Sequence, residues 1–245
     1  MDKRKAFKRL CQKVGQTIYK QKLLAPGDKI LIGMSGGKDS FLLLELLDER
    51  RKHLTFPIEL IAIHVKIKEL GYSADEEALK RFCSQYKVPF YFVEDSIGSD
   101  LSTSGKAPCF VCSWHRRKNI FQFAQSMGCN KVALGHHRDD ALQTFLLNLI
   151  YHGSISSLPY QLSMFDGQIT LIRPLLDLSE KEILAYTRLA NYPEEIKECA
   201  YKNNNKREQI KILLQNIRKL HPLAEKNMFR SMHNIFEEYL PGKTK

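Results

Sequence analysis

The sequence of 245 residues lacks any uninterrupted apolar stretch of about 18 residues, so it offers no membrane-spanning helix. Its first residues are charged and no apolar segment follows them, so we expect no signal peptide, no membrane partner and a cytosolic location. It has only six cysteines, too few for a disulfide scaffold, and no internal repeat. With 43% hydrophobic residues, the chain can bury a core without covalent staples.

Acidic residues are scarce: 27 Asp and Glu stand against 38 Lys and Arg, a net charge of +11 at pH 7. Such an excess favours polyanionic partners, nucleic acid first and an anionic membrane surface second, although a solvated basic surface has the same composition. Residues 3–22 combine apolar residues at helical spacing with basic side chains and no acid. This pattern predicts an amphipathic basic helix. From residue 203 onward the sequence is again helical and basic.

Short apolar runs alternate with helical periodicity between residues 26 and 190. Because the runs are almost continuously apolar, they predict an α/β fold with a doubly wound, mostly parallel sheet covered on both faces, extended by helices at the N- and C-terminal ends. Asp166-Gly167 lies between two β-prone runs and predicts a hairpin. Two capping boxes are predicted, at Ser73 with Glu76 and at Ser179 with Glu182. The predicted strands are residues 29–34, 58–65, 89–94 and 131–135.

The first predicted strand ends in GMSGGKDS, residues 33–40, and leads directly into a helix. Small residues at such a junction let backbone N–H groups converge on an anion, and the positive end of the helix adds to the attraction. Ile32 and Asp39 stand where a Walker A motif requires Gly and Ser or Thr, so the loop is of another kind. An acid here would repel phosphate unless Mg²⁺ lies between them, so Asp39 indicates a metal–nucleotide ligand. The candidate loop residues are Ser35, Gly36, Gly37, Lys38, Asp39 and Ser40.

Cys109 and Cys112 form a C-x-x-C pair before a helix rich in basic side chains, a setting that favours thiolates. Three kinds of site fit the spacing: a zinc site completed by His115 and a remote Cys, a thiol–disulfide pair, or an iron–sulfur site. The last needs a third thiolate, for which Cys199 is a candidate. Spacing alone does not choose between them. The remaining cysteines fit small buried hydrophobes better than ligands: Cys11, Cys83 and Cys129.

A polar cluster, GHHRDD at residues 135–140, follows the fourth predicted strand. Ligands of doubly wound sheets gather at the carboxyl ends of strands, where the phosphate loop also lies. We expect one of the two acids to cap the next helix and the other, Asp140, to hold Mg²⁺ or take a proton. Adjacent histidines point apart in a helix, so joint ligation is not expected. Arg173 could meet a phosphate or form an ordinary salt bridge.

In this order the motifs resemble those of the tRNA 2-thiocytidine synthetases, which belong to the PP-loop (N-type) ATP pyrophosphatases. SGGKDS is similar to the PP-loop signature, and LGHHRDDALQTFLLNL and IRPLLDLSEKEI are similar to later segments of that family. The resemblance covers residues 15–210. One departure is that the family usually has a second C-x-x-C around the late Cys, whereas this chain has Ile196 three positions before Cys199.

The resemblance implies an ATP-dependent tRNA sulfurtransferase. It would adenylate the C2 oxygen of an anticodon-loop cytidine (position 32 in the family), release pyrophosphate and replace the oxygen with sulfur. It implies ATP, Mg²⁺ and a [4Fe-4S] cluster as cofactors, and tRNA and a sulfur donor such as a cysteine desulfurase as partners; the protein could also form a homodimer. The resemblance implies that Cys109, Cys112 and Cys199 are the ligands of the cluster. The catalytic residues would be Lys38, Asp39, Asp140 and Cys199. The adenylate would contact the loop, the backbone at Ile63 and Val65, and Gly135. His64 is expected to pack rather than catalyse.

We therefore expect three parts: an N-terminal basic helix at residues 1–25, a PP-loop ATP-binding α/β domain at residues 26–190, and a C-terminal basic helical region at residues 191–245 that carries the third Cys. Two alternatives stay open. One is another tRNA-modifying PP-loop enzyme, of the 2-thiouridine or lysidine type. The other is a non-catalytic, zinc-stabilised RNA-binding protein.

Overall fold

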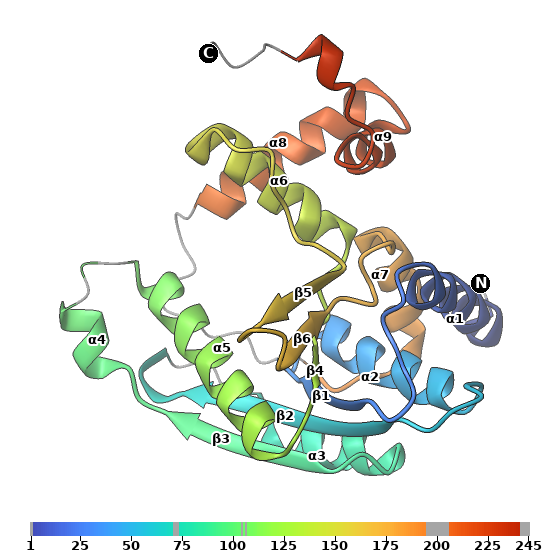
Figure 1. Ribbon diagram of the computed structural model, residues 1–245, viewed down its shortest axis with the longest axis vertical. Helices are drawn as coiled ribbons and strands as arrows, with labels where there is room; N and C mark the ends of the chain where they lie inside the picture. The colour runs from blue at the N-terminus through green and yellow to red at the C-terminus, as the bar shows by residue number, and fades with distance from the viewer. Residues whose placement is uncertain (1, 71–73, 104, 106, 195–205, 241–245) are drawn as a thin grey trace. The chain divides into compact units, whose positions relative to one another are not determined.

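The computed structural model describes residues 2–70, 74–103, 105, 107–194 and 206–240 (Figure 1). None of the helices within these ranges is long and apolar enough to cross a membrane. The chain divides into two compact units, one formed by Met1–His137 and Pro159–Asn203 and the other by Arg138–Leu158 and Asn204–Lys245. These boundaries differ from those of the three parts expected from the sequence, which stay a prediction.

The first unit is built on a six-stranded sheet with strand order β3-β2-β1-β4-β6-β5. The pairs from β3 to β6 are parallel, and only β5 runs antiparallel to its neighbour β6 (Figure 1). The predicted α/β class with a mostly parallel sheet is therefore confirmed. The strands are β1 (Lys29–Gly33), β2 (Glu59–Ile67), β3 (Phe90–Asp95), β4 (Lys131–Ala133), β5 (Gln161–Met164) and β6 (Ile169–Ile172).

Helices cover both faces of this sheet because successive strand residues point to opposite sides. Ile30 and Ile32 belong to a core cluster shared with the helices α1 (Lys3–Lys20), α2 (Lys38–Arg51), α3 (Glu76–Gln85) and α7 (Glu180–Ala190). Leu31 belongs to a second cluster, which is shared with α5 (Pro108–Ser126). Figure 1 shows α1, α2 and α7 on one side of β1 and α5 on the other. The unit also contains the short helix α4 (Gly98–Thr103) and a 3₁₀ turn, η1 (Lys68–Leu70).

The second unit is helical. It comprises α6 (Arg138–His152), α8 (Lys206–Leu220), α9 (Ala224–Ser231) and a 3₁₀ turn η2 (Glu237–Tyr239). The predicted helix after GHHRDD thus packs with the C-terminal helices, through an apolar cluster formed by Leu142, Leu146, Ile210 and Leu214. Lys206, at the start of α8, lies 4.2 Å from the ring centre of Tyr151 on α6. A small apolar core and this cation–π contact both contribute to holding the unit together.

Local signals in the sequence were mostly correct. The Ser179–Glu182 capping box is present, and Asp166-Gly167 lies in the β5–β6 turn. The predicted Ser73–Glu76 box is wrong for α3, because the Asp75 side chain caps the helix by accepting from the Ala78 N–H at 3.0 Å; Ser73 lies outside the described residues. Cys83 and Cys129 are buried, as expected for small hydrophobes, and Cys11 is half-buried.

Candidate functional site

The phosphate loop leaves β1 at Gly33 and enters α2 at Lys38. Gly36 has φ of +83°, a backbone conformation that side chains other than glycine rarely adopt, so this residue makes the turn possible. Gly37 occupies the N-cap position of α2 and provides no capping side chain. The first N–H groups of α2 are therefore arranged for an external anion, as at other helix N-termini that bind phosphate.

Two hydroxyl groups hold the loop in shape. The Ser35 Oγ accepts a hydrogen bond from the Gly37 N–H at 3.2 Å, and the Ser40 Oγ donates to the Gly37 carbonyl at 2.8 Å. The two hydroxyl oxygens lie 3.4 Å apart. Ser40 is buried, so its hydroxyl serves the loop, whereas Ser35 lies at the exposed surface where a ligand can meet it.

Lys38 brings a positive charge to the start of α2 and lies between two carboxylates. Its Nζ is 3.1 Å from Asp39 Oδ2 and 3.8 Å from Glu180 Oε1, at the start of α7. The Lys38 and Asp39 side chains are each more than a quarter exposed, so an incoming phosphate can reach both. A triphosphate would offer the ammonium group a stronger, multiply charged partner than either carboxylate.

Gly135 lies against the same loop. A Cβ at this position would come within 3.0 Å of the Asp39 carbonyl oxygen and 3.3 Å of the Ser40 nitrogen, both in the first turn of α2. Gly135, the second residue after β4, therefore has to be glycine because it packs on the backbone of the phosphate loop. The structure thus brings together two motifs that are about a hundred residues apart in the sequence.

The middle of β2, which in the structure runs to Ile67, supports the loop from its other side. The Met34 N–H donates to the Ile63 carbonyl at 2.8 Å, and the Ile63 and Val65 side chains are buried in the core. The His64 ring, 1% exposed, lies 2.7 Å through its Nδ1 from the Met34 carbonyl. Since a carbonyl oxygen only accepts, Nδ1 carries the proton, and burial lowers the pKa of His64, which keeps the ring neutral. The sequence interpretation of His64 as a packing residue missed this role in holding the loop.

Cys109 and Cys112 lie in the first turn of α5, which begins at Pro108. They are three residues apart on the helix and therefore share a face. Cys109 is exposed and Cys112 is half-buried. Sulfur donors at a helix N-terminus fit a soft centre such as an iron–sulfur cluster, so the chemistry of the two residues agrees with that cofactor. Cys199, the predicted third ligand, lies outside the described residues, and the described part of the chain contains no group of three or more His, Cys, Asp or Glu arranged for a metal ion.

His115 does not join the cysteine pair, contrary to what a zinc site would need. It is 7% exposed, and its Nδ1 and Nε2 lie 2.9 Å and 2.7 Å from carboxylate oxygens of Asp95 and Asp100. Asn119 adds a hydrogen bond to Asp95 at 2.6 Å. This network around the buried His115 ties α5 to the end of β3 and to α4, and so fixes the helix that carries the cysteines. Single-sequence reasoning could not find it, because the partners lie 15 and 20 residues away.

Asp139 and Asp140 both lie in the first turn of α6, in the second unit. Asp139 is buried and its carboxylate accepts a hydrogen bond from Arg218 of α8, which also contacts Glu225. Asp139 therefore has a structural partner, and Asp140 stays the predicted acting residue of the pair. Arg173, after β6, donates to the Pro159 carbonyl at 2.7 Å, and no ion pair links it to the described residues.

A parallel sheet whose first strand leads through this loop into a helix defines a class of nucleotide-binding protein, and the model of the PP-loop domain family matches residues 6–216. A tRNA-cytidine(32) 2-sulfurtransferase of Verminephrobacter eiseniae is 36% identical over 241 residues, 97% of this chain and 76% of that protein. Another, of Pseudomonas fluorescens, is 33% identical over 247 residues, 99% of this chain and 89% of that protein. The chain belongs to the family of tRNA-cytidine(32) 2-sulfurtransferases within the PP-loop proteins.

Among solved structures, the U34-tRNA thiolase NcsA from Methanococcus maripaludis, solved with its [4Fe-4S] cluster, is similar to this chain over its full length and over 83% of the thiolase. The TM-score is 0.80 and the sequence identity is 27%. The likeness to a thiolase that binds a cluster agrees with the sulfur donors at the start of α5.

Proposed function

We propose that this protein is an ATP-dependent tRNA sulfurtransferase that converts cytidine 32 of the anticodon loop to 2-thiocytidine. The observation that carries the proposal is the phosphate loop, in which the partly exposed Lys38 stands at an α2 start that has no capping side chain. Identity of 33–36% to tRNA-cytidine(32) 2-sulfurtransferases over almost the whole chain supports the choice of substrate.

The first half of the reaction is adenylation. The C2 oxygen of the cytidine attacks the α-phosphorus of ATP, a C2–O–P bond forms, and the bond to the β-phosphate breaks to release pyrophosphate. The N–H groups at the start of α2 and the Lys38 ammonium stabilise negative charge that builds up on the phosphate oxygens. Neutral His64 holds Met34 and thus the loop in place, so little reorganisation is needed when the charge develops.

We place Mg²⁺ between Asp39 and the phosphates, and we keep Asp140, at the start of α6, as a proposed catalytic carboxylate. Asp39 supplies a carboxylate oxygen beside Lys38, and the ATP phosphates supply further oxygens, which is the donor set that Mg²⁺ prefers. Without the metal, the Asp39 charge would oppose triphosphate binding.

In the second half, sulfide-level sulfur attacks C2, a C2–S bond forms, and the C2–O bond breaks so that AMP leaves. Where the donor is a cysteine desulfurase, which carries the sulfur as a persulfide, a thiol reductant supplies the two electrons that bring the sulfur to this level. We propose that Cys109, Cys112 and Cys199 hold a [4Fe-4S] cluster, which would supply an iron site for the sulfur atom. The His115 network fixes the α5 turn that carries the first two cysteines. The target cytidine has to leave the base stack to reach the site, as in other single-stranded RNA recognition. We propose that the reaction takes place in the cytosol. That the protein forms a homodimer stays a prediction.

A second candidate is 2-thiouridine formation, which the likeness to the U34-tRNA thiolase NcsA favours. Cytidine is the better choice because sequence identity to the cytidine-specific enzymes, 33–36%, exceeds the 27% to that thiolase. A lysidine-forming enzyme would have no use for the cysteine pair. A zinc-stabilised RNA-binding protein would need a further ligand near the pair, and His115 is already bound by two carboxylates.

The test is a reaction with anaerobically reconstituted protein, tRNA that lacks the modification, Mg-ATP and sulfide. We expect AMP, pyrophosphate and 2-thiocytidine in equal amounts. A matched tRNA with uridine at position 32 is the control and should give no thiolated product. Formation of 2-thiouridine, or of 2-thiocytidine without AMP, would contradict the proposal.

A further inference from the structure

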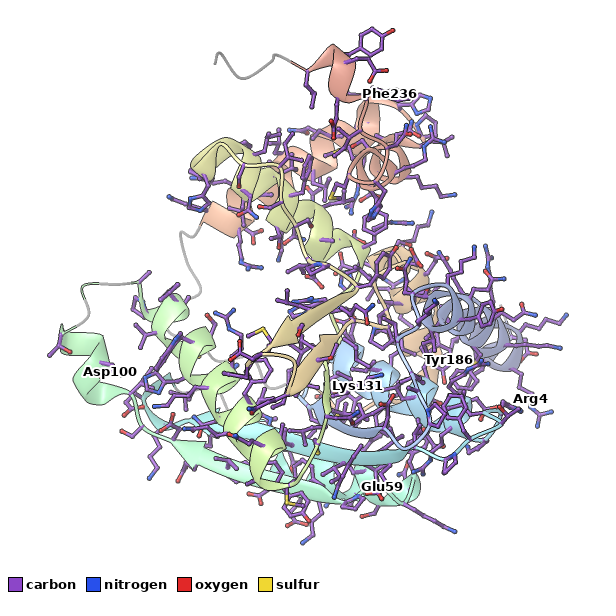
Figure 2. All side chains as sticks on the ribbon, viewed as in Figure 1. Arg4, Glu59, Asp100, Lys131, Tyr186 and Phe236 are labelled. Carbon is purple, nitrogen blue, oxygen red and sulfur yellow. The ribbon has the colours of Figure 1, made fainter. Side chains whose placement is uncertain are left out.

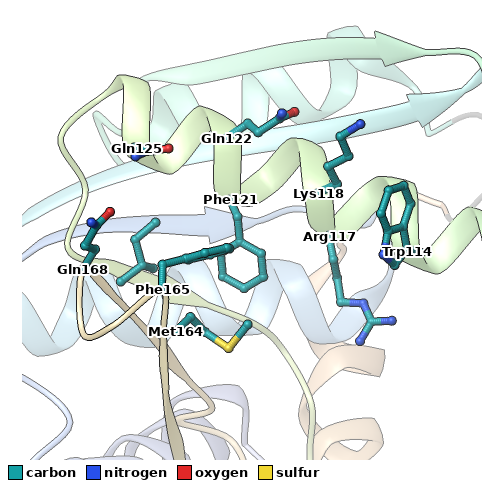
Figure 3. A pocket seen from close by; sticks show the side chains of 10 residues that line it. Trp114, Arg117, Lys118, Phe121, Gln122, Gln125, Met164, Phe165 and Gln168 are labelled. Carbon is teal, nitrogen blue, oxygen red and sulfur yellow. The ribbon is translucent and has the colours of Figure 1, made fainter.

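A cavity of about 410 Å³ lies between α5 and the β5–β6 hairpin of the first unit, separate from the phosphate loop. Its size falls within the range of about 300–1,000 Å³ that is typical of small-ligand pockets. Figure 3 shows Phe121, Phe165 and Met164 in its middle, Trp114 and Arg117 at one end, and glutamine side chains at the other. The lining contains no acidic residue.

Aromatic surface is unusually accessible here. Trp114 and Phe165 are 46% and 52% exposed, and the Phe165 ring meets the Phe121 ring edge-on at 5.3 Å between centres. Phe165 has φ of +52°, a left-handed conformation that is rare for an aromatic residue, in the turn between β5 and β6. The hairpin therefore presents this ring to α5 and leaves one side of it open. Exposed aromatic rings beside a cavity are suitable surfaces for stacking a planar group.

Positive charge accompanies the rings. Lys118 lies with its Nζ 5.3 Å from the centre of the Trp114 ring, and neither Lys118 nor Arg117 forms an ion pair with another described residue. Arg173, 5% exposed, has an Nε without a hydrogen-bond partner among the described residues. Burial and, second, the nearby charge of Arg117 lower the pKa of Arg173 to about 10. The charge of Arg117 therefore acts on a second guanidinium group, and phosphate is the anion that guanidinium binds best in a bidentate way.

Position along α5 connects the cavity to the proposed chemistry. Trp114 comes two residues after Cys112, and Phe121 lies nine residues after it, which is about 14 Å along a helix. At about 100° per residue both rings lie on the side of α5 opposite Cys112, so an RNA strand whose target base reaches the cysteines has to cross α5 to place a neighbouring base in the cavity. Glutamine amides at the far end, which both donate and accept, can bond the edge of a base.

We propose that this cavity binds an unpaired nucleobase of the tRNA, which stacks on Phe165 while its phosphate pairs with Arg117 beside Trp114. The inference rests on the proposed function, because it takes tRNA as the substrate. Stacking on aromatic side chains beside basic groups is the usual way in which proteins hold single-stranded RNA. An acidic peptide would satisfy the charges but would have no planar group for the open aromatic surface.

Trp114 is the only tryptophan of the chain, so its fluorescence reports on this cavity directly. We expect an anticodon stem-loop RNA to quench this fluorescence in a saturable way. Phe165→Ala and Arg117→Ala should each weaken binding about tenfold, raise the KM for tRNA and leave kcat at saturating tRNA unchanged, whereas Phe165→Tyr should keep the affinity. Phe236→Ala, which removes a ring of similar exposure (56%) in the second unit, is the matched control. Heparin, which has charge but no bases, should bind Phe165→Ala as well as the wild type.

Unchanged RNA affinity of Phe165→Ala and Arg117→Ala, in protein that still forms 2-thiocytidine, would overturn this inference and leave the proposed function intact. Quenching by an acidic peptide rather than by RNA would overturn it as well. If the wild-type protein neither bound nor thiolated tRNA, the proposed function itself would fail, and this inference with it.

Discussion

Lys38 is the side chain on which the phosphate chemistry depends most directly. We expect Lys38→Ala to lower the rate of pyrophosphate release by about 100- to 1,000-fold, because it removes a full positive charge from the developing phosphate charge. The fold should be unaffected, since the side chain is 29% exposed and its ion pairs within the described ranges are those with Asp39 and Glu180. The measurement is pyrophosphate release with tRNA and Mg-ATP. Lys181→Ala, which removes the same charge next to Glu180, should behave as the wild type; equal losses in both variants would contradict the assignment.

The carboxyl group of Glu182 makes the stability of the fold depend on pH. Burial raises the pKa of its carboxyl, but the hydrogen bond from Lys13 and those from Ser179 outweigh it and lower the pKa from 4.5 to about 2. Because the pKa is lowered on folding, the charged group stabilises the fold above pH 4.5, and this contribution is lost as the pH falls towards 2. We expect Glu182→Gln, which can still cap α7, to lower the free energy of unfolding by about 1–2 kcal/mol at neutral pH.

Urea unfolding of the wild type and of Glu182→Gln, at several pH values, tests this. The difference in the free energy of unfolding should shrink between pH 4.5 and 2. A difference that is independent of pH would show that the charge on Glu182 is not what stabilises α7.

Among individual residues, the sequence predicted those whose role depends on neighbours in the same short segment. Gly36, Lys38 and Asp39 belong to one short motif whose chemistry is local. His64 and His115 could not be assigned, because their partners lie 30 residues away for His64 and 15 to 20 residues away for His115, and only the fold brings them together. Cys199 stays a proposed ligand and a proposed catalytic residue.

Among the elements, β1 and β4 are joined at their starts by a buried ion pair. Lys131 Nζ lies 2.7 Å from Asp28 Oδ2 and 2.8 Å from the Leu23 carbonyl. Figure 2 labels Lys131 among the side chains of the first unit. Asp28 also accepts from the Ala25 N–H at 2.6 Å. Removing one partner of such a pair leaves a buried charge without compensation. We expect Lys131→Met to lower the free energy of unfolding by about 3 kcal/mol, measured by urea denaturation.

The matched control for this pair is Lys29→Met. Lys29 and Glu59 lie on neighbouring strands, 3.6 Å apart, with Glu59 72% exposed. An exposed pair of this kind contributes about 0–1 kcal/mol, so this variant should unfold almost like the wild type. If the two substitutions cost the same, the ion pair of Lys131 does not hold the two strands.

The elements that the sequence predicted best are the strands, because a strand buried on both faces is apolar along its whole length. The helix after GHHRDD and the helical C-terminal region were also predicted, but not that they pack together, since an apolar stripe does not reveal its partner. α4 has no apolar stripe and was not predicted, because its polar sequence is typical of a loop. The start of α3 was misplaced, since both Ser73 and Asp75 are residues that cap helices and Asp75 lies nearer.

For the molecule as a whole, the net charge of +11 is the property that favours tRNA. We expect tRNA affinity to fall steeply with salt, by about 1,000-fold or more between 50 and 200 mM if six or more phosphates are contacted. The measurement is the slope of log Kd against log salt concentration from filter binding. An affinity that does not change with salt would mean that the basic residues do not face the RNA.

The central claim, that this protein activates and thiolates cytidine, is tested most directly by mass spectrometry of tRNA nucleosides. The comparison is between cells that lack the protein and the same cells supplied with the wild type or with Lys38→Ala. We predict that 2-thiocytidine disappears on deletion, returns with the wild type and does not return with Lys38→Ala. Persistence of 2-thiocytidine in the deletion strain, or loss of a 2-thiouridine in its place, would contradict the account.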